Sequence, residues 1–421
     1  MSAVGQLLSV PILSSAWGVE QYGVWLMLAT IPTYFALSDL GFGSAAGSDI
    51  AMKAARGEQQ EALSTFQSIW LLVNAVSLGL LIIAVASLEG ARALQFRAAS
   101  DHELTILILV LYSAVVMNAR IFLVSLRATQ NYASGTLLFE IIAFAETLSV
   151  LVAARLGSDF LDCALIMVFV RLLNLAIMHR ALKRLVPWLR VGFAHGSFDE
   201  LRRLFLPAVA AMAIPAALAI NLQGFVLVTG LLVSASAAAM LTTVRTISRV
   251  TVQLVGTINR ATMPELSAAG ARQQRSTLQK IILLNFASVA LILMPGALLL
   301  AVIGPELISL WTQGHIQPDW MLVGIISTAT VVHGLWYYLS NLLLASNSHT
   351  NVSWSLLAIS LCSIAIAAPV AMAFGLTGLG SVILLNESIS LLAVLRAASK
   401  QNIFNATELK AVAKATLWGS R

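Results

Sequence analysis

Charged residues are scarce in this chain. Asp, Glu, Lys and Arg make up 10% of its 421 residues, whereas soluble domains carry about 25%. Hydrophobic residues supply 59% of the sequence, and the mean hydropathy is +0.88. A chain of this composition lacks the polar residues that cover the surface of a water-soluble domain. The composition therefore excludes an ordinary soluble protein and predicts a polytopic membrane protein.

The chain also lacks the residue patterns of common catalytic and cofactor sites. Its two cysteines, Cys163 and Cys362, fall in separate apolar stretches and form neither a metal motif nor a disulfide framework. The sequence contains no Asp-x-Asp pair, no zinc-binding spacing of His and Cys, and no glycine loop for phosphate. One acid/base cluster, 101–103 (DHE), lies in a short loop and is interpreted as a solvated connector. We therefore expect no enzyme, cofactor or metal, and an integral-membrane glycan enzyme is the weakest alternative.

Apolar stretches of about the length of a bilayer crossing, roughly 20 residues, recur along the chain. We predict twelve such spans, near 1–17, 22–43, 65–87, 104–126, 136–156, 160–181, 205–230, 235–260, 279–303, 320–345, 350–373 and 376–397. These runs indicate an all-α protein with about twelve transmembrane helices. The first span is short, which leaves open a start further upstream. No basic residue precedes Lys53, so the beginning of the chain does not resemble a secretory signal peptide.

Basic residues concentrate in loops on one side of the predicted membrane. The net charge is +6, and most Lys and Arg residues fall within 53–56, 180–203, 260–280 and the tail from 396. Loops on the opposite side contain Arg92, Arg97 and Arg155. By the positive-inside rule, the more basic loops and both termini are cytoplasmic. Orientation in the membrane accounts for the positive charge, so we expect no nucleic-acid partner.

A short internal repeat accompanies the span pattern. Residues 54–60 (AARGEQQ) and 268–274 (AAGARQQ) are identical at four of seven positions, at an offset of 214 residues. An even number of predicted spans separates the two copies, so the halves are expected to be parallel repeats. We predict two six-helix lobes around a central cavity, over 1–182 and 205–398. A basic amphipathic connector over 183–204 joins them, and 399–421 form a cytoplasmic tail.

The stretch from Leu241 to Arg260 combines an apolar background with arginines. Arg245 and Arg249 are four residues apart, so on a helix they share one face. One arginine at the bilayer centre costs about 2.5–3.5 kcal/mol on insertion scales, so this face must meet protein or a wet cavity. One interpretation is a structural pair bonded to neighbouring helices. The other is a basic cavity wall for an anionic solute.

Three motifs near the N-terminus resemble a known family. They are GVEQYGVW at 18–25, LSDLGFGSA at 37–45 and AARGEQQEA at 54–62. These motifs resemble the polysaccharide-transporter branch of the multidrug/oligosaccharidyl-lipid/polysaccharide (MOP) exporter superfamily, which contains the O-antigen and exopolysaccharide repeat-unit flippases. The resemblance implies a bacterial inner-membrane protein that moves a polyprenyl-diphosphate-linked oligosaccharide outward by alternating access. It also implies membrane lipids and polysaccharide polymerase or assembly proteins as partners.

A diphosphate is a dense anion, and arginine forks in a pocket of low dielectric constant hold it best. Within the predicted spans, the cationic candidates for this role are Arg245, Arg249, Arg120 and Arg171. The first two are preferred because they share a helix face. For Arg120 and Arg171, ion pairing with Glu140 or Glu146 is the structural alternative.

Sugars need hydrogen bonds and flat apolar surfaces. Tyr337 and Asn341 follow His333 at helical spacing in the tenth predicted span, which makes them candidates for the oligosaccharide. Packing of an ordinary aromatic cluster is the alternative interpretation.

Acidic residues at membrane depth are candidates for coupling transport to a proton or a sodium ion. The candidates for coupling are Asp39, Glu140 and Glu387. For Asp39, a helix-end position at the cytoplasmic interface is the alternative. A multidrug extruder of the same architecture is the alternative function, because its typical cargo is cationic and favours acidic cavities. The intramembrane arginines argue against that cargo.

Overall fold

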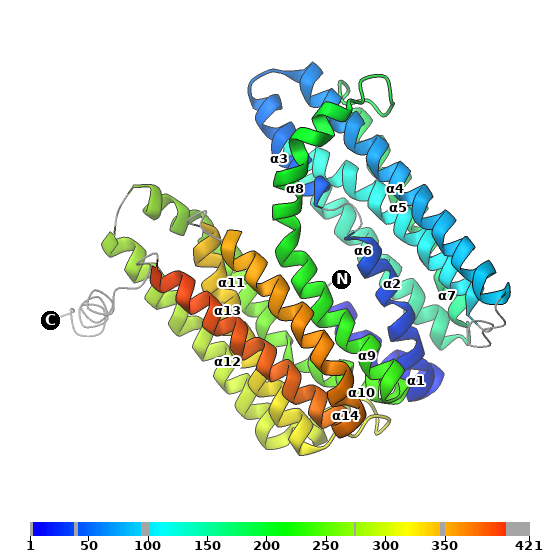
Figure 1. Ribbon diagram of the computed structural model, residues 1–421, viewed down its shortest axis with the longest axis vertical. Helices are drawn as coiled ribbons and strands as arrows, with labels where there is room; N and C mark the ends of the chain where they lie inside the picture. The colour runs from blue at the N-terminus through cyan, green and yellow to red at the C-terminus, as the bar shows by residue number, and fades with distance from the viewer. Residues whose placement is uncertain (1–2, 38–40, 94–101, 273–274, 346–349, 401–421) are drawn as a thin grey trace. The chain divides into compact units, whose positions relative to one another are not determined.

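Helices account for all regular secondary structure that the structure describes, as Figure 1 shows. This computed structural model describes residues 3–37, 41–93, 102–272, 275–345 and 350–400. Its elements are α1 (Ala3–Leu28), α2 (Thr30–Phe35), α3 (Phe42–Ala55), α4 (Gln59–Ala93), α5 (Glu103–Ala128), α6 (Tyr132–Arg155), α7 (Phe160–Leu185), α8 (Phe198–Ala219), the π-helix η2 (Ile220–Gly224), α9 (Phe225–Leu232), α10 (Ala235–Ser248), α11 (Val250–Ala271), α12 (Arg275–Trp311), α13 (Trp320–Ala345) and α14 (Thr350–Lys400). Helices pair their backbone groups internally, which the hydrocarbon core of a bilayer requires. The predicted all-α class is confirmed.

Among the described residues, eight helices are long and apolar enough to cross a membrane. Some helices contain parts of two predicted spans. In α14 the spans 350–373 and 376–397 are separated by Gly375, with φ 59° and ψ −143°. In α1 the first two predicted spans are separated by Gly18, with φ 79° and ψ 163°. A positive φ strains residues with a Cβ, so glycine permits both breaks.

The chain divides into two compact units, Met1–Ala219 and Ile220–Arg421. The sequence predicts the boundary between the lobes at the connector, 183–204. In the structure the first unit extends further, to the end of α8, because α8 packs against α3 and α4. The parallel relationship of two six-helix lobes stays a prediction.

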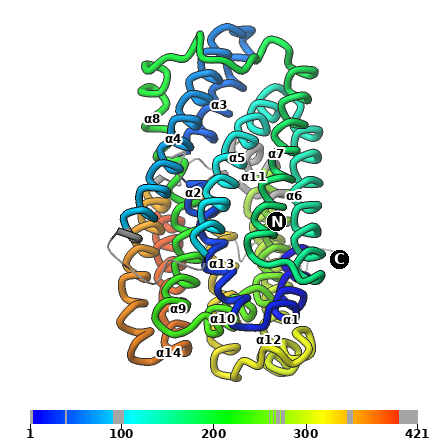
Figure 2. Tube along the Cα trace, turned by 90° about the vertical axis from the view of Figure 1, so that its right-hand side faces the viewer, coloured from blue at the N-terminus to red at the C-terminus, as the bar shows by residue number. Residues whose placement is uncertain are grey.

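In the first unit, α5 is the central helix. It packs against α2, α3, α4, α6 and α7, and Figure 2 shows α4, α5 and α7 running side by side. Phe66, Phe122, Leu126 and Met178 are almost fully buried in the core between these helices. Close packing is helped by Gly135, because a Cβ there would lie 2.9 Å from the Leu126 Cβ.

In the second unit, α13 is the central helix. It packs against α10, α11, α12 and α14, while α9 and η2 lie against α14. Leu322, Ile326 and Tyr338 of α13 are almost fully buried. The arrangement brings polar side chains of α10, α13 and α14 to the interior of this unit, where the candidate site lies.

Candidate substrate-binding site

Arg245 and Arg249 extend from one continuous helical path. Ser234 caps the start of α10 by accepting a hydrogen bond from the Ala237 N–H at 3.0 Å. Arg249 lies between α10 and α11 with helical dihedral angles, φ −76° and ψ −5°. Its N–H donates to the Arg245 carbonyl at 3.0 Å, and the Gln253 N–H donates to the Arg249 carbonyl at 3.1 Å. The predicted shared face is therefore preserved across the junction.

Both arginines line one pocket of the second unit. The pocket measures about 290 Å³, part of which is open solvent, and is lined by Arg245, Arg249, Ile326, Ala329, Thr330, His333, Ile383 and Glu387. Its walls come from α10, α13 and α14. Two cations, one carboxylate and one imidazole thus meet beside the Thr330 hydroxyl and three apolar side chains.

Arg245 is buried, with 7% of its surface exposed, and its guanidinium is held by Asn221. Nη2 donates to the Asn221 Oδ1 at 2.7 Å, and Nη1 donates to the Asn221 carbonyl at 3.2 Å. The guanidinium also lies 5.8 Å from the centre of the Phe225 ring. Asn221 belongs to the π-helix η2, and this type of turn occurs frequently at functional sites. The backbone carbonyl that accepts the hydrogen bond from Arg245 therefore lies within the π turn.

Glu387 receives hydrogen-bond donors on both carboxylate oxygens. Trp336 Nε1 donates to Oε2 at 2.6 Å, and His333 Nδ1 lies 2.9 Å from the same oxygen. Asn221 Nδ2 donates to Oε1 at 3.2 Å. The residue is 4% exposed, so these bonds replace the water that a carboxylate requires. The adjacent Asn386 accepts a hydrogen bond from the Ser363 Oγ at 2.9 Å, which fixes this turn of α14.

Arg249 differs from Arg245 in its partners. Its side chain is partly exposed, and within the described part of the chain it makes no hydrogen bond or ion pair. Its guanidinium is attracted to Glu387 electrostatically. Arg249 is therefore the cation of this pocket whose N–H donors are available to an anion.

Of the two sugar candidates, Tyr337 lies one side chain away from the pocket. The Tyr337 ring stacks on His333, with centroids 6.0 Å apart and planes at 14°. Asn341 Nδ2 donates to the Tyr337 carbonyl at 2.7 Å, so the amide bonds to its own helix. Neither residue lines the pocket itself. Their role toward a sugar stays a prediction.

In the first unit, Arg171 forms a buried ion pair with Glu146, as the structural alternative predicted. Arg171 Nε lies 2.5 Å from Glu146 Oε2, and Nη2 donates to Oε1 at 3.3 Å. Tyr112 Oη donates to the same Oε1 at 2.8 Å. The guanidinium also faces the Tyr112 and Phe139 rings, at 5.9 and 5.2 Å. These contacts make Arg171 part of the interior packing of α5, α6 and α7.

The remaining candidates are not brought into the pocket. Arg120 of α5 and Glu140 of α6 are exposed residues of the first unit. Asp39 lies outside the described residues. Their predicted roles in substrate binding and ion coupling stay predictions.

Two polar residues of the site were absent from the candidates taken from the sequence. Asn221 interrupts an apolar run six residues after Pro215, and that isolated amide is the signal that marks it. Trp336 stands next to the candidate Tyr337, but sequence spacing does not show that its indole N–H reaches Glu387.

Comparison with known proteins identifies the fold. No family model and no curated protein matches the sequence. A solved structure titled an inward-facing conformation of a multidrug resistance MATE family transporter of the MOP superfamily matches with a TM-score of 0.76 and 13% identity, over 99% of this chain and 96% of that one. The outward-facing conformation of such a transporter matches with a TM-score of 0.62 and 12% identity, over 98% and 95% of the two chains. A MATE structure in the bent conformation matches with a TM-score of 0.61 and 11% identity, over 99% and 95%.

The chain therefore has the fold of the MATE transporters of the MOP superfamily. The fold that the resemblance of the three N-terminal motifs implies is confirmed, whereas membership of the superfamily stays a prediction. At identities of 11–13% this likeness concerns the fold alone, and the cargo must be argued from the site.

Proposed function

We propose that this protein is an alternating-access flippase. It translocates a polyprenyl-diphosphate-linked oligosaccharide from the inner to the outer face of a bacterial cytoplasmic membrane, for the synthesis of a surface polysaccharide. The observation that carries this proposal is the pocket in which Arg249, without a hydrogen-bonded or ion-paired partner among the described residues, lies beside Arg245.

The charge of the pocket favours an anionic cargo. Arg245 and Arg249 contribute two positive charges, against one negative charge from Glu387. A guanidinium binds phosphate oxygens through two parallel N–H donors, and burial strengthens such bonds. The diphosphate of a lipid-linked oligosaccharide supplies oxygens of this kind next to a long apolar chain. The sugars would extend toward Tyr337, while the polyprenyl chain stays in lipid.

The fold supports a transport mechanism. Solved structures with this fold are titled inward-facing and outward-facing, as alternating access requires. A proton or sodium ion is the expected coupling ion, with Glu387 the coupling candidate that lines the pocket. Both termini are expected in the cytoplasm, near proteins that assemble the polysaccharide.

Export of cationic drugs is the second candidate function. Two observations favour it: Glu387 lies in the pocket, and the structures matched above include a multidrug resistance transporter. Against it, both Glu387 oxygens already have donors from Asn221, His333 and Trp336. A cationic drug would have to compete with those donors and with two arginines. An anionic cargo could bind Arg249 without displacing a hydrogen-bonded partner among the described residues.

Deletion of the gene in its native bacterium distinguishes the two functions. A flippase predicts loss of surface polysaccharide, with accumulation of the lipid-linked repeat unit at the inner face. The wild-type gene should restore export, and a variant with Arg396→Ala, remote from the pocket in sequence, should restore it equally. Unchanged polysaccharide together with new sensitivity to cationic drugs would reject the flippase and support the extruder.

A further inference from the structure

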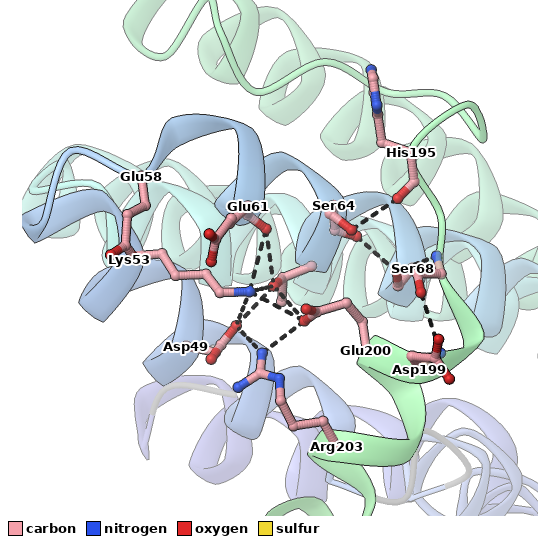
Figure 3. A network of polar contacts seen from close by, with 12 residues as sticks. Asp49, Lys53, Glu58, Glu61, Ser64, Ser68, His195, Asp199, Glu200 and Arg203 are labelled. Carbon is pink, nitrogen blue, oxygen red and sulfur yellow. Dashed lines mark hydrogen bonds and ion pairs between the residues drawn. The ribbon is translucent and has the colours of Figure 1, made fainter.

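The segment between α7 and α8 is held tightly against α4. The buried Gln67 binds it twice: Nε2 donates to the Arg190 carbonyl at 3.0 Å, and Oε1 accepts from the His195 N–H at 2.7 Å. Ser64 Oγ donates to the His195 carbonyl at 2.9 Å, and Ser68 Oγ accepts from the Ser197 N–H at 2.8 Å. Figure 3 shows the serine contacts along one side of the helix. Residues 190–197 are thus fixed by side chains of a single helix.

The start of α8 is fixed by a network of ions. Asp49 Oδ2 accepts from Lys53 Nζ at 3.1 Å, Thr65 Oγ1 at 2.7 Å and Arg203 Nη2 at 2.7 Å. Glu200 Oε2 accepts from Lys53 Nζ at 3.2 Å and from Arg203 Nη2 at 2.7 Å, and it lies 3.1 Å from Thr65 Oγ1, whose single proton goes to Asp49. Figure 3 shows these side chains converging from α3, α4 and α8. Two cations and two carboxylates therefore neutralise one another and lock the first turns of α8 in place.

This fixed segment and the first turns of α8 carry a set of exposed large apolar residues and exposed arginines. We call it the connector face, and it consists of Arg190, Phe193, Phe198, Arg202, Phe205 and Leu206. Phe198 is 79% exposed, Leu206 76% and Phe193 60%. Exposure of such side chains to water is unfavourable in free energy, and a fixed backbone does not allow them to become buried elsewhere in the unit.

Helical geometry explains why most of this face is exposed, although the Phe205 ring lies 6.3 Å from the Phe42 ring. Phe198, Arg202 and Phe205 fall at i, i+4 and i+7 and share one side of α8. Leu204 and Ala208 lie roughly 90–130° around the helix from this side and are buried in the core of the unit. α8 therefore enters the membrane span Phe198–Leu232 with one apolar side already turned outward. The connector face is continuous with a surface that lipid covers, so lipid is its natural occupant.

The charges on this face specify which lipid. Within the described residues Arg202 makes no hydrogen bond or ion pair, and Arg190 bonds to the Pro187 carbonyl at 3.4 Å. The nearby Glu200 is already neutralised by Lys53 and Arg203. Two guanidinium groups flanking inserted phenylalanines match the phosphates of an anionic bilayer surface.

We propose that the connector face is a binding surface for anionic phospholipid headgroups, with Phe193 and Phe198 inserted at the headgroup and acyl boundary. The proposal is independent of the transported substrate. Each arginine near an anionic membrane surface contributes about a five-fold preference. Replacing both should therefore reduce selectivity for anionic lipid by about 25-fold.

The test uses the full chain with Cys163→Ala and Cys362→Ala, and a spin label on Phe193→Cys or, separately, on Phe198→Cys. The protein is placed in nanodiscs of phosphatidylcholine, with or without phosphatidylglycerol. Accessibility of the label to oxygen and to a water-soluble nickel complex reports its depth. With phosphatidylglycerol, both labels should become more accessible to oxygen and less accessible to nickel.

The shift in oxygen and nickel accessibility that phosphatidylglycerol causes should disappear in the double variant Arg190→Gln, Arg202→Gln. A matched control, Arg155→Gln, Arg396→Gln, removes equal charge elsewhere and should retain it. Labels that stay in water in both membranes would overturn the proposal, and so would equal depth in both. Shielding that appears only after a cytoplasmic protein fraction is added would replace lipid with a protein partner.

Discussion

Arg245 and Glu387 carry opposite charges but are joined through Asn221. Arg245 Nη2 donates to the Asn221 Oδ1 at 2.7 Å, and Asn221 Nδ2 donates to the Glu387 Oε1 at 3.2 Å. One amide thus satisfies a buried cation on one side and a buried carboxylate on the other. Glu387 is hydrogen-bonded by Asn221 and by side chains of α13. Arg249 has no hydrogen-bonding acceptor among the described residues.

The first prediction separates binding from folding at Arg249. Arg249→Ala should reduce polysaccharide export about ten-fold or more, because charge-assisted hydrogen bonds contribute about 1.5–3 kcal/mol. Protein abundance should be unchanged, since the native side chain makes no hydrogen bond or ion pair among the described residues. Arg249→Lys should retain part of the export, because lysine keeps the charge but lacks the fork. Normal export by Arg249→Ala in the complemented deletion strain would exclude a substrate role for this residue.

The second prediction concerns the bridging amide. Asn221→Leu removes the side-chain acceptor of Arg245 and one donor to Glu387, while the backbone carbonyl remains. Loss of a partner from a buried charge costs about 3–5 kcal/mol. The purified variant should therefore unfold at a markedly lower temperature. Gln223→Leu, in the same π segment, should change it little, because this side chain makes no hydrogen bond among the described residues. Equal melting temperatures for the two variants would show that the bridge does not support the fold.

Part of this picture follows from the sequence. The helices are predictable because they depend on the lengths of apolar runs, and the common face of Arg245 and Arg249 follows from their spacing of four. The link through Asn221 is not predictable, because it depends on a π turn and on how α9 packs beside α14. The pairing of Arg171 was foreseen only as one of two alternatives, since spacing does not decide which glutamate faces it.

The third prediction tests Arg171 as a structural residue. Arg171→Met should lower abundance and melting temperature, because Glu146 would remain as an unpaired buried carboxylate at a cost of about 3–5 kcal/mol. Adding Glu146→Leu should restore both, since replacing a whole buried pair by apolar residues is often neutral or stabilising. Measuring export by the Arg171→Met, Glu146→Leu variant decides whether the charge of Arg171 is needed for transport. Full stability without export would identify Arg171 as a substrate residue.

The fourth prediction is the orientation of the chain. In a background of Cys163→Ala and Cys362→Ala, a cysteine at Gln313 should react with an impermeant thiol reagent added to intact cells. A cysteine at His195 should react only after the membrane is opened. Both positions are exposed, so accessibility within the protein does not limit either reaction. Reversed labelling would contradict the assignment of sides by loop charge.

The last prediction concerns the ion network at the start of α8. Burial alone would raise the pKa of Asp49, but hydrogen bonds from Arg203, Thr65 and Lys53 outweigh it and lower the pKa from 3.8 to about 2. Asp49 lies in α3, which is outside the candidate membrane spans. Because the folded state favours the ionised carboxylate, this group adds to the free energy of unfolding above its unfolded pKa. The contribution is about 2 kcal/mol and is lost as the pH falls from 3.8 toward 2.

Asp49→Asn should therefore lower the stability of the purified protein by about 2 kcal/mol at pH 7. The difference between wild type and variant should shrink as the pH falls from 3.8 toward 2, because the unfolded wild-type chain then binds a proton at Asp49 that the folded protein does not yet bind. Glu58→Gln is the control, since its ion pair with Arg56 is long, at 3.9 Å, and exposed, so its removal should change stability by less than about 0.5 kcal/mol. A difference for Asp49→Asn that is as large at pH 3 as at pH 7 would mean that packing, not ionisation, explains the effect.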